Sequence, residues 1–316
     1  LPSIEADTIS YIQYTSGSTR FPRGVVIEHH TVMANLAGIT QHGMEIGPED
    51  RLVSWLPFYH DMGLVGFVLT PVAAQISVDY LDTREFAMRP RQWLKLMTES
   101  RGTISFAPSF GYDLCARRVR ANDIASYDLS NWRVAGIGAE MIRPQTLDHF
   151  AEILAPCGFD PKAFTACYGM AECTLGVSFS PLNETYSTHY VDSDHLADSH
   201  KAVLINEEEF EGRGRHFVNC GKPLPCFEVE VRDDDDKPLP DWHSGVIYVR
   251  GPSVMSGYYN LPEESSQALC DDGWLNTGDI GYSVDGNLTI TGRKKDLIII
   301  HGRNIWPQDL EHIAET

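Results

Sequence analysis

The sequence predicts an α/β fold in which a parallel sheet flanked by helices is followed by a smaller, mainly β subdomain. Three observations lead to this prediction. Short apolar runs alternate with helical patterns over residues 1–182, and strands of alternating polarity dominate residues 217–294. Hydrophobic residues make up 42% of the 316 positions, which is enough for a sizeable core. The same composition excludes disorder, collagen and coiled coil as the main architecture.

The first part of the chain contains the strands and helices of the predicted parallel sheet. Short apolar runs predict strands at Ile9–Tyr14, Val25–Ile27, Leu52–Trp55, Ile76–Leu81, Thr103–Phe106, Arg133–Ile137 and Phe164–Cys167. Helical spacing predicts helices at Thr31–Gln41, Met62–Ala74, Pro90–Glu99 and Gln145–Leu154. Strands that alternate with helices are typical of a parallel sheet whose two faces are both covered.

The pattern changes at about Asn183. Residues 183–216 are polar, acidic and histidine-bearing without a clear period, which predicts a long loop or an insertion. Beyond it, alternating polarity predicts strands at Phe227–Val231, Val246–Arg250 and Asn287–Thr291. The chain is therefore divided into an α/β subdomain (1–182), the insertion (183–216) and a β-rich subdomain (217–294).

The charge balance limits the partners. Lys and Arg number 25 against 44 Asp and Glu, a net charge of −19, which argues against nucleic acid and anionic membranes as partners. The longest apolar run, Met62–Ala74, is too short for a membrane span and contains Pro71. The seven cysteines include no CxxC pair. Reduced thiols in a cytoplasmic protein are the simplest interpretation.

A loop rich in Ser, Thr and Gly joins the first two predicted strands. Residues Thr15–Gly24 present hydroxyls and bare backbone N–H groups, which are the donors that surround phosphate oxygens, and Arg20 and Arg23 add positive charge. The spacing differs from the Walker pattern, because no GK[ST] follows at the required distance. An ordinary loop is the alternative interpretation of this string taken alone.

Five strings together resemble the adenylate-forming superfamily, which contains acyl-CoA synthetases, luciferases and the adenylation domains of peptide synthetases. They occur in the family's order along the chain: Tyr14–Gly24, Tyr168–Glu172, Gly251–Tyr258, Asn276–Asp279 and Gly292–Asp296. The resemblance implies the fold of the family's large domain and an ATP-dependent activity with Mg²⁺.

The resemblance also assigns residues to ATP. It places Thr15, Ser16, Gly17, Ser18, Thr19 and Arg20 at the phosphates, Gly138, Ala139, Glu140, Tyr168 and Gly169 around adenine, and Asp279 and Arg293 at the ribose. Glu172 is the implied magnesium ligand, and Lys295 matches the hinge between catalytic conformations. Thr15, Glu172, His60 and Lys295 are the expected catalytic residues. A core tyrosine, a turn aspartate and a surface lysine remain alternatives for Tyr168, Asp279 and Lys295.

The string Leu56–Gly63 resembles the family segment around a histidine at the acyl pocket. His60 is expected near the reacting carboxylate, and a core histidine is the alternative. Gly66, Phe67 and Phe110 are the expected lining residues of an acyl tunnel. A tunnel wall and an ordinary core have the same sequence pattern.

Departures from the general family pattern resemble the fatty acyl-AMP ligase branch. They are Arg20, Ala171, the tail over residues 297–311 and the insertion over 183–216. In that branch the insertion restricts the small C-terminal domain and disfavours CoA, so the acyl group passes to the phosphopantetheine of an acyl carrier protein. An acyl-CoA ligase and a non-catalytic acyl- or nucleotide-binding module are the alternatives.

Both ends of the sequence look cut relative to this family. The chain begins at Leu1 and ends in an amphipathic stretch over residues 310–316, and residues 295–316 are expected to be the hinge and the start of the C-terminal domain. The family's catalytic lysine lies in that domain. We therefore expect the 316-residue piece by itself to adenylate very poorly.

Overall fold

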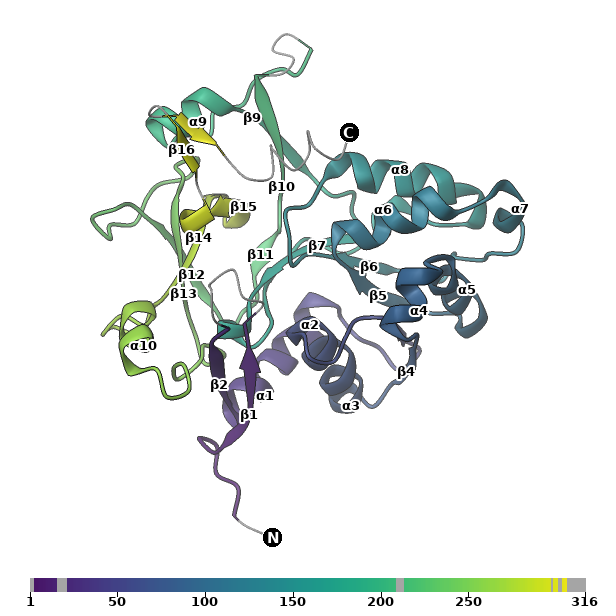
Figure 1. The fold of residues 1–316 in the computed structure, drawn as a ribbon, viewed down its shortest axis with the longest axis horizontal. Coiled ribbons are helices and arrows are strands. Elements are labelled where there is room, and N and C mark those ends of the chain that lie inside the picture. The colour runs from purple at the N-terminus through teal and green to yellow at the C-terminus, as the bar shows by residue number, and fades with distance from the viewer. Residues whose placement is uncertain (1–2, 16–21, 209–212, 297, 301–302, 306–316) are drawn as a thin grey trace.

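The computed structural model describes residues 3–15, 22–208, 213–296, 298–300 and 303–305. Its centre is a mixed sheet in the order β11-β8-β7-β6-β5-β3-β4 (Figure 1). The strands are β3 Arg51–Ser54, β4 Ser77–Tyr80, β5 Ile104–Ala107, β6 Val134–Ile137, β7 Phe164–Gly169, β8 Gly176–Phe179 and β11 Lys222–Pro223. Strands β3 to β7 are parallel, whereas β8 and β11 run antiparallel to their neighbours. The predicted α/β class is confirmed.

Helices cover both faces of this sheet, as expected for parallel strands. In Figure 1, α6 and α8 lie on one side and α1, α2 and α3 on the other. The helices are α1 His29–Gly38, α2 Asp61–Leu64, α3 Thr70–Ala74, α4 Thr83–Met88, α5 Arg91–Ser100, α6 Ser109–Arg118, α7 Ala121–Ile124 and α8 Pro144–Leu154. The helix predicted over Met62–Ala74 is interrupted by a π-helical turn, η2 Val65–Leu69, and η1 Ile39–Gly43 is a second π-helical turn after α1.

Aromatic side chains from several elements form the core beneath α6 and α8. The ring of Tyr112 lies 5.0 Å from that of Phe150 and 5.5 Å from that of Phe164, and both pairs are edge-to-face. The indole of Trp93 donates a 2.9 Å hydrogen bond to Ser105. Such pairs bury large apolar areas and fix the helices over the strands, because edge-to-face geometry is favoured between aromatic rings.

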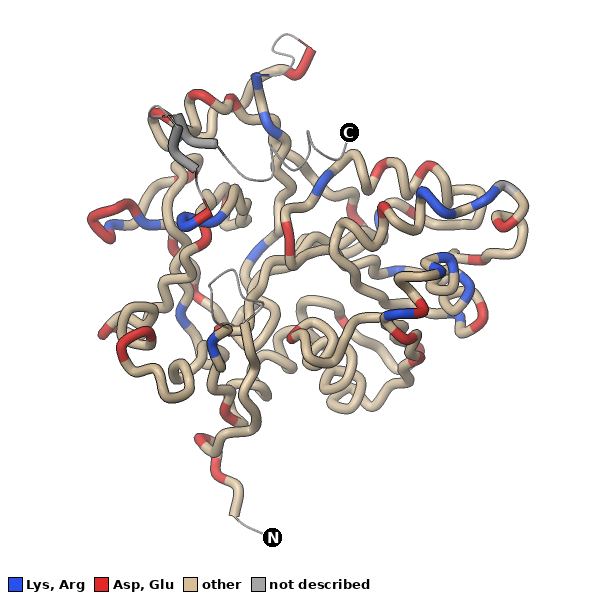
Figure 2. The backbone as a smooth tube through the Cα atoms, viewed as in Figure 1, with Lys and Arg blue, Asp and Glu red and all other residues tan. Residues whose placement is uncertain are grey.

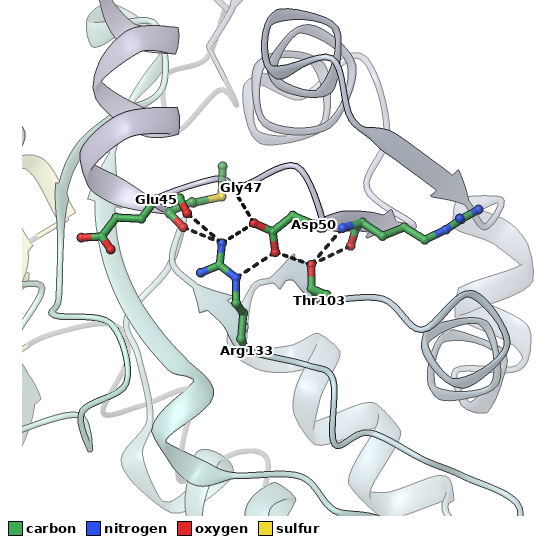
Figure 3. Close-up of polar contacts among 7 residues, drawn as sticks. Glu45, Gly47, Asp50, Thr103 and Arg133 are labelled. Atoms are coloured by element: carbon green, nitrogen blue, oxygen red, sulfur yellow. Dashed lines mark hydrogen bonds and ion pairs between the residues drawn. The ribbon is translucent and has the colours of Figure 1, made fainter.

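A buried ion pair fastens the amino ends of three neighbouring strands (Figure 3). The guanidinium of Arg133, just before β6, donates to both Asp50 oxygens at 2.8 and 2.6 Å, and Asp50 stands just before β3. The same carboxylate accepts from the Thr103 hydroxyl at 2.7 Å and the Gly47 amide at 2.8 Å. Burial by itself raises the pKa of Asp50, but the bonds from Arg133, Gly47 and Thr103 outweigh burial and hold the pKa below its ordinary value.

The later part of the chain forms an antiparallel sheet in the order β12-β13-β14-β15. Its elements are β12 Glu228–Arg232, β13 Gly245–Arg250, α10 Pro262–Ala268, β14 Leu275–Val284 and β15 Asn287–Arg293. Two further antiparallel pairs are β1 Ile9–Tyr14 with β2 Gly24–Glu28, and β16 Ile298–Ile300 with β17 Arg303–Ile305. The short helical turns are η3 Ala155–Cys157, η4 Pro161–Ala163, η5 Ala171–Cys173 and η6 Lys294–Asp296. The predicted mainly β second part is confirmed.

Residues 183–216 are more regular than expected. They contain β9 Thr188–Asp192 and α9 Ser193–Ser199, and they lead into β10 Gly214–Val218, which pairs antiparallel with β9. Val191, Leu196, Ala202 and Phe217 form a small cluster with Tyr282 of β14. The expectation of a long loop was wrong for the residues of β9 and α9, and an insertion stays a prediction. Val191, Leu196 and Ala202 are buried but irregularly spaced in a polar stretch, so they gave no clear period.

Charge is spread over the whole fold. Figure 2 shows Asp and Glu residues on most elements, often with Lys or Arg nearby. Arg51 and Asp79 make such a pair across β3 and β4 at 2.6 Å, and Arg250 and Glu228 make another at 2.7 Å. Such pairs carry no net charge, so the net charge of −19 comes from carboxylates outside them.

Candidate active site

Two adjoining cavities open where the parallel strands end. The larger has a volume of about 1120 Å³ and the smaller about 950 Å³. Both are lined by Ala139, Cys167, Tyr168, Gly169 and Arg293. Ligands of α/β sheets bind at this edge, outside the carboxyl ends of the strands, so the position alone marks a candidate site.

Asp279, Arg293 and Tyr168 meet in one hydrogen-bonded group between the cavities. Strand register places Asp279 of β14 opposite Arg293 of β15, whose Nε donates to Asp279 Oδ1 at 2.8 Å. The Tyr168 hydroxyl, 111 residues away in the chain, donates to Oδ2 at 2.7 Å. Asp279 is only 3% exposed. Burial raises the pKa of Asp279, although Arg293 and Tyr168 act against it, and burial raises that of Tyr168 well above its usual value.

Glu172 lies in the turn η5, directly after β7, and lines the larger cavity. Its Oε1 accepts a 2.8 Å hydrogen bond from the hydroxyl of Tyr258. Burial raises the pKa of the Glu172 carboxyl, and the bond from Tyr258 works in the opposite direction. The backbone amide of Glu172 is a second hydrogen-bond donor to this carboxylate, and it too lowers the pKa.

Thr15 and Arg23 close the base of the Ser/Thr/Gly loop. The Thr15 amide donates to the Arg23 carbonyl at 2.9 Å, and the Arg23 amide donates to the Thr15 hydroxyl at 3.2 Å. Both residues line the larger cavity. The expected phosphate ligands between them lie outside the described residues, namely Ser16, Gly17, Ser18, Thr19 and Arg20.

His60 and Lys295 also line the larger cavity. His60 precedes α2, and its Nδ1 lies 2.7 Å from Asp61 Oδ1. The Met62 amide donates to Asp61 Oδ1 at 2.7 Å and also lies 3.2 Å from His60 Nδ1. Nδ1 therefore donates to Asp61 when it carries a proton and accepts from Met62 when it does not. The hydrogen bond to Asp61 raises the pKa of His60. Lys295 is exposed, and partial burial together with the neighbouring Arg293 lowers its pKa.

The segment from Gly138 to Glu140 follows β6 and passes close to β7. A Cβ atom at Gly138 would lie 2.7 Å from the Cys167 carbonyl oxygen, so only glycine fits there. Ala139 has φ of +68°, a left-handed conformation that is strained for alanine, and it lines both cavities. The carboxylate of Glu140 accepts from the Phe110 amide at the start of α6 at 3.0 Å.

The expected acyl-lining residues fall into different places. His60 lines the larger cavity and Phe110 the smaller, whereas Gly66 and Phe67 are buried and line neither of these two. Sequence reasoning missed the apolar wall of the larger cavity, which includes Leu64, Phe106, Leu175 and Phe179. A usable signal was available for two of them, because Leu175 and Phe179 follow the Tyr168–Glu172 string within a hairpin's length.

Among the residues that the structure describes, no group of three or more His, Cys, Asp and Glu side chains is arranged to hold a metal ion. A single carboxylate is nevertheless what a nucleotide-bound Mg²⁺ requires, since that ion takes its other ligands from phosphates and water. Glu172 fits this role by its position in the wall of the larger cavity. Within the described ranges, no helix has both the length and the apolar character needed to cross a membrane.

Comparison with known proteins places this arrangement in a family. The profile of the AMP-binding enzymes matches residues 1–259, so the chain belongs to the AMP-binding enzyme family. A Caulobacter vibrioides protein provisionally named an acyl-CoA synthetase is 48% identical over the whole chain, which covers 55% of that protein. The medium-chain-fatty-acid–[acyl-carrier-protein] ligase JamA of Moorena producens is 36% identical over 99% of the chain, which covers 54% of JamA.

A solved structure is also closely similar. It comes from structural and functional studies of fatty acyl-adenylate ligases from E. coli and L. pneumophila, and it superposes with a TM-score of 0.94 at 55% identity. The match covers 100% of this chain and 57% of that one. The chain thus spans about half the length of the relatives it matches.

Proposed function

We propose that the protein is a fatty acyl-AMP ligase, which joins a fatty acid to AMP from ATP and releases pyrophosphate. The observation that supports the proposal is that a polar, charged surface and an apolar surface adjoin each other within one site. The polar group of Asp279, Arg293 and Tyr168 and the carboxylate of Glu172 adjoin a cavity whose far wall is apolar. A nucleotide and a fatty acid need these two surfaces side by side.

The adenosine part of the nucleotide is assigned to the smaller cavity and the shared wall, and its phosphates to the larger cavity, which Thr15 and Glu172 line. Asp279 and Arg293 hold the ribose hydroxyls, and adenine lies between Tyr168–Gly169 and the segment Gly138–Glu140. Thr15 and the loop residues Ser16, Gly17, Ser18, Thr19 and Arg20 bind the phosphates. The buried Asp279 is held by two donors, so it presents its oxygens without having to reorganise.

The reaction requires positioning more than proton transfer. The fatty carboxylate attacks the α-phosphorus of ATP, and pyrophosphate leaves in line. When bound, Mg²⁺ would neutralise phosphate charge, and Glu172 would hold it. The chain contributes the cation Arg23 at the base of the loop, Lys295 at the cavity rim, and His60, whose ring is oriented by Asp61 beside the expected carboxylate.

The acyl chain is assigned to the apolar part of the larger cavity. Phe179 of β8 lies opposite Cys167, which is two residues before the end of β7 at Gly169. Phe106 of β5 lies opposite Gly136 of β6, and Gly136 in turn lies opposite Thr165 of β7. Both rings therefore lie deeper in the sheet than the strand ends. Phe106 and Phe179 are edge-to-face at 6.4 Å between centroids, and they close this end.

The residues expected from the sequence form a second layer behind this wall. Phe67 packs edge-to-face on Phe106 at 5.9 Å, and a Cβ at Gly66 would lie 3.5 Å from Leu175. Phe110 contacts Trp55 at 5.9 Å on the side of the smaller cavity. We keep His60 as the acyl residue nearest the reacting carboxylate, with Gly66 and Phe67 supporting the wall.

The acceptor of the acyl group is proposed to be the phosphopantetheine arm of an acyl carrier protein. The similarity to JamA, a ligase named for that acceptor, supports this choice. Packing of Val191, Leu196 and Ala202 on Tyr282 of β14 supports it too, because in the resembling branch the insertion predicted over 183–216 disfavours CoA. A fatty acyl-CoA ligase is the second candidate, favoured by the name of the Caulobacter relative. ATP and seven free thiols point to a cytoplasmic location.

Product analysis separates the candidates. The full polypeptide is incubated with ATP, Mg²⁺ and fatty acids of increasing length, alone, with CoA, or with holo carrier protein, and products are read by mass spectrometry. We expect acyl-AMP without an acceptor and acyl-carrier protein with one, and loss of both with Asp279→Asn. A dominant acyl-CoA product would favour the ligase for CoA, and absence of any adenylate would favour a non-catalytic binding module.

A further inference from the structure

The segment Gly251–Tyr259, which the proposed reaction leaves without a role, is hydrogen-bonded to the turn that carries Glu172. The Met255 amide donates to the Glu172 carbonyl at 2.8 Å, and the Ser253 hydroxyl donates to the Cys173 carbonyl at 3.1 Å. In return, the Thr174 hydroxyl donates to the Ser253 carbonyl at 3.2 Å. Three consecutive residues of the turn are therefore fixed from one side by this segment.

The same segment is paired with β2, the strand that leaves the phosphate loop. The Val26 amide donates to the Gly257 carbonyl at 3.0 Å, and the Tyr259 amide donates to the Gly24 carbonyl at 2.7 Å. Val25 and Tyr258 form the bridge between these two bonds. One short segment thus joins the exit strand of the loop to the turn of Glu172.

Tyr258 is the residue of this segment that touches both partners with its side chain. Its hydroxyl donates to Glu172 Oε1 at 2.8 Å, and the Arg23 guanidinium lies over its ring at 5.1 Å from the centroid. Arg23 in turn closes the loop base with Thr15. Tyr258 is only 8% exposed.

We propose that Tyr258 is a positioning residue that holds the Glu172 carboxylate in place for magnesium and fixes it relative to Arg23 and Thr15 at the base of the loop. The inference rests on the proposed function, in which Glu172 binds the ion. The hydrogen bond from Tyr258 to Oε1 restricts the rotation of the carboxylate, which would otherwise turn about its bond to Cγ. Partners that orient a metal ligand in this way typically change metal affinity by roughly 10- to 100-fold when removed.

The substitution Tyr258→Phe removes the hydroxyl and keeps the ring beneath Arg23. In the full polypeptide with ATP present, we expect the Mg²⁺ concentration for half-maximal ATP–pyrophosphate exchange to rise roughly tenfold. Binding of Mn²⁺, measured by electron paramagnetic resonance, should weaken by the same factor. The KM for fatty acid should stay at its wild-type value, and saturating Mg²⁺ should restore the rate.

Tyr186→Phe is the matched control, because the Tyr186 hydroxyl also donates to a carboxylate, that of Asp148, outside both cavities. It should leave the Mg²⁺ requirement unchanged. Wild-type Mn²⁺ affinity in Tyr258→Phe, combined with loss in Glu172→Gln, would overturn the role of Tyr258 and leave the proposed metal ligand standing. Wild-type Mn²⁺ affinity in Glu172→Gln would instead overturn the ligand itself. Ser253→Ala loosens the turn without touching the carboxylate. It should shift Mn²⁺ affinity less than Tyr258→Phe does. Equal shifts in the two variants would overturn the specific role of the Tyr258 hydroxyl.

Discussion

His60 takes its protonation behaviour from the residue next to it. The Nδ1 atom of His60 lies 2.7 Å from the Asp61 carboxylate, and this hydrogen bond raises the pKa of the ring above 6.5. A raised histidine pKa contributes stability that is fully present below the unfolded pKa and is lost as pH rises through the folded pKa. The pair therefore stabilises the start of α2 on the acid side of neutrality.

Asp61→Asn tests this pair. We expect the pKa of His60, followed by NMR titration, to fall towards its ordinary value because the charged partner is gone. The loss of denaturant midpoint relative to wild type should be larger below pH 6.5 than in alkaline solution. An equal loss at both pH values would show that Asp61 acts only as an acceptor for the Met62 amide.

At the residue scale, the sequence motifs identified individual candidate site residues more reliably than the hydrogen-bond partners of those residues. The strings containing Asp279 and Arg293 predicted a gripping pair, and strand register does place them opposite each other. The bond from Tyr258 to Glu172 joins residues 86 positions apart, so no local spacing could have indicated it. The sequence analysis therefore included Tyr258 in the string Gly251–Tyr258 but could not predict that it contacts Glu172.

At the scale of elements, the strand ends depend on the ion pair of Asp50 and Arg133. The Asp50 side chain is 7% exposed and that of Arg133 30%, so removing the cation leaves a buried carboxylate uncompensated. We expect Arg133→Met to lower the free energy of unfolding by roughly 3 kcal/mol in denaturant titrations. Arg89→Met, which removes a largely exposed pair with Glu85, should cost less than about 0.5 kcal/mol. If both variants lost the same free energy of unfolding, the hydrogen bonds from Thr103 and Gly47 would be enough to stabilise the buried Asp50 carboxylate.

The aromatic end wall of the larger cavity should set the acyl length. Phe179→Ala removes the ring packed against Phe106 and leaves space at the deep end. We expect the preferred fatty acid to become longer, with kcat/KM for longer chains rising relative to shorter ones by roughly tenfold. Met88→Ala, at an exposed apolar residue outside both cavities, serves as the control. An unchanged length profile would move the acyl chain away from this wall.

Element prediction succeeded where periodicity was strong and failed where it was weak. The buried strands at Leu52–Trp55 and Thr103–Phe106 match β3 and β5 within a residue or two. The helix predicted at Met62–Ala74 contains a π-helical turn, since apolar spacing does not distinguish one helical pitch from another over so few residues. Gly66 and Phe67 were expected in the cavity because a cavity wall and a core share one sequence pattern. Only the packing of η2 in the structure shows that both residues are buried behind the wall.

At the scale of the whole molecule, residues 183–218 connect the two sheets. The β9–β10 hairpin extends the chain between β8 and β11, and its cluster packs on Tyr282 of the antiparallel sheet. The His189 ring reinforces the contact, with Nδ1 2.9 Å from the Tyr282 hydroxyl. The resembling branch implies that this packing limits which acceptor reaches the acyl-adenylate. Weakening the packing should then change the transfer of the acyl group to its acceptor and leave the formation of acyl-AMP unchanged.

Leu196→Asp places a charge in that cluster, where the leucine is 7% exposed. A buried unpaired carboxylate is unfavourable, so α9 should detach from β14 and show faster amide exchange. We expect acyl-AMP formation at the wild-type rate and a larger share of acyl-CoA relative to acyl-carrier protein. Ser199→Asp puts the same charge at an exposed position of α9 and should change neither. If α9 detached and the ratio of acyl-CoA to acyl-carrier protein did not change, this segment would not determine the acceptor. The choice of acceptor would then depend on other parts of the polypeptide.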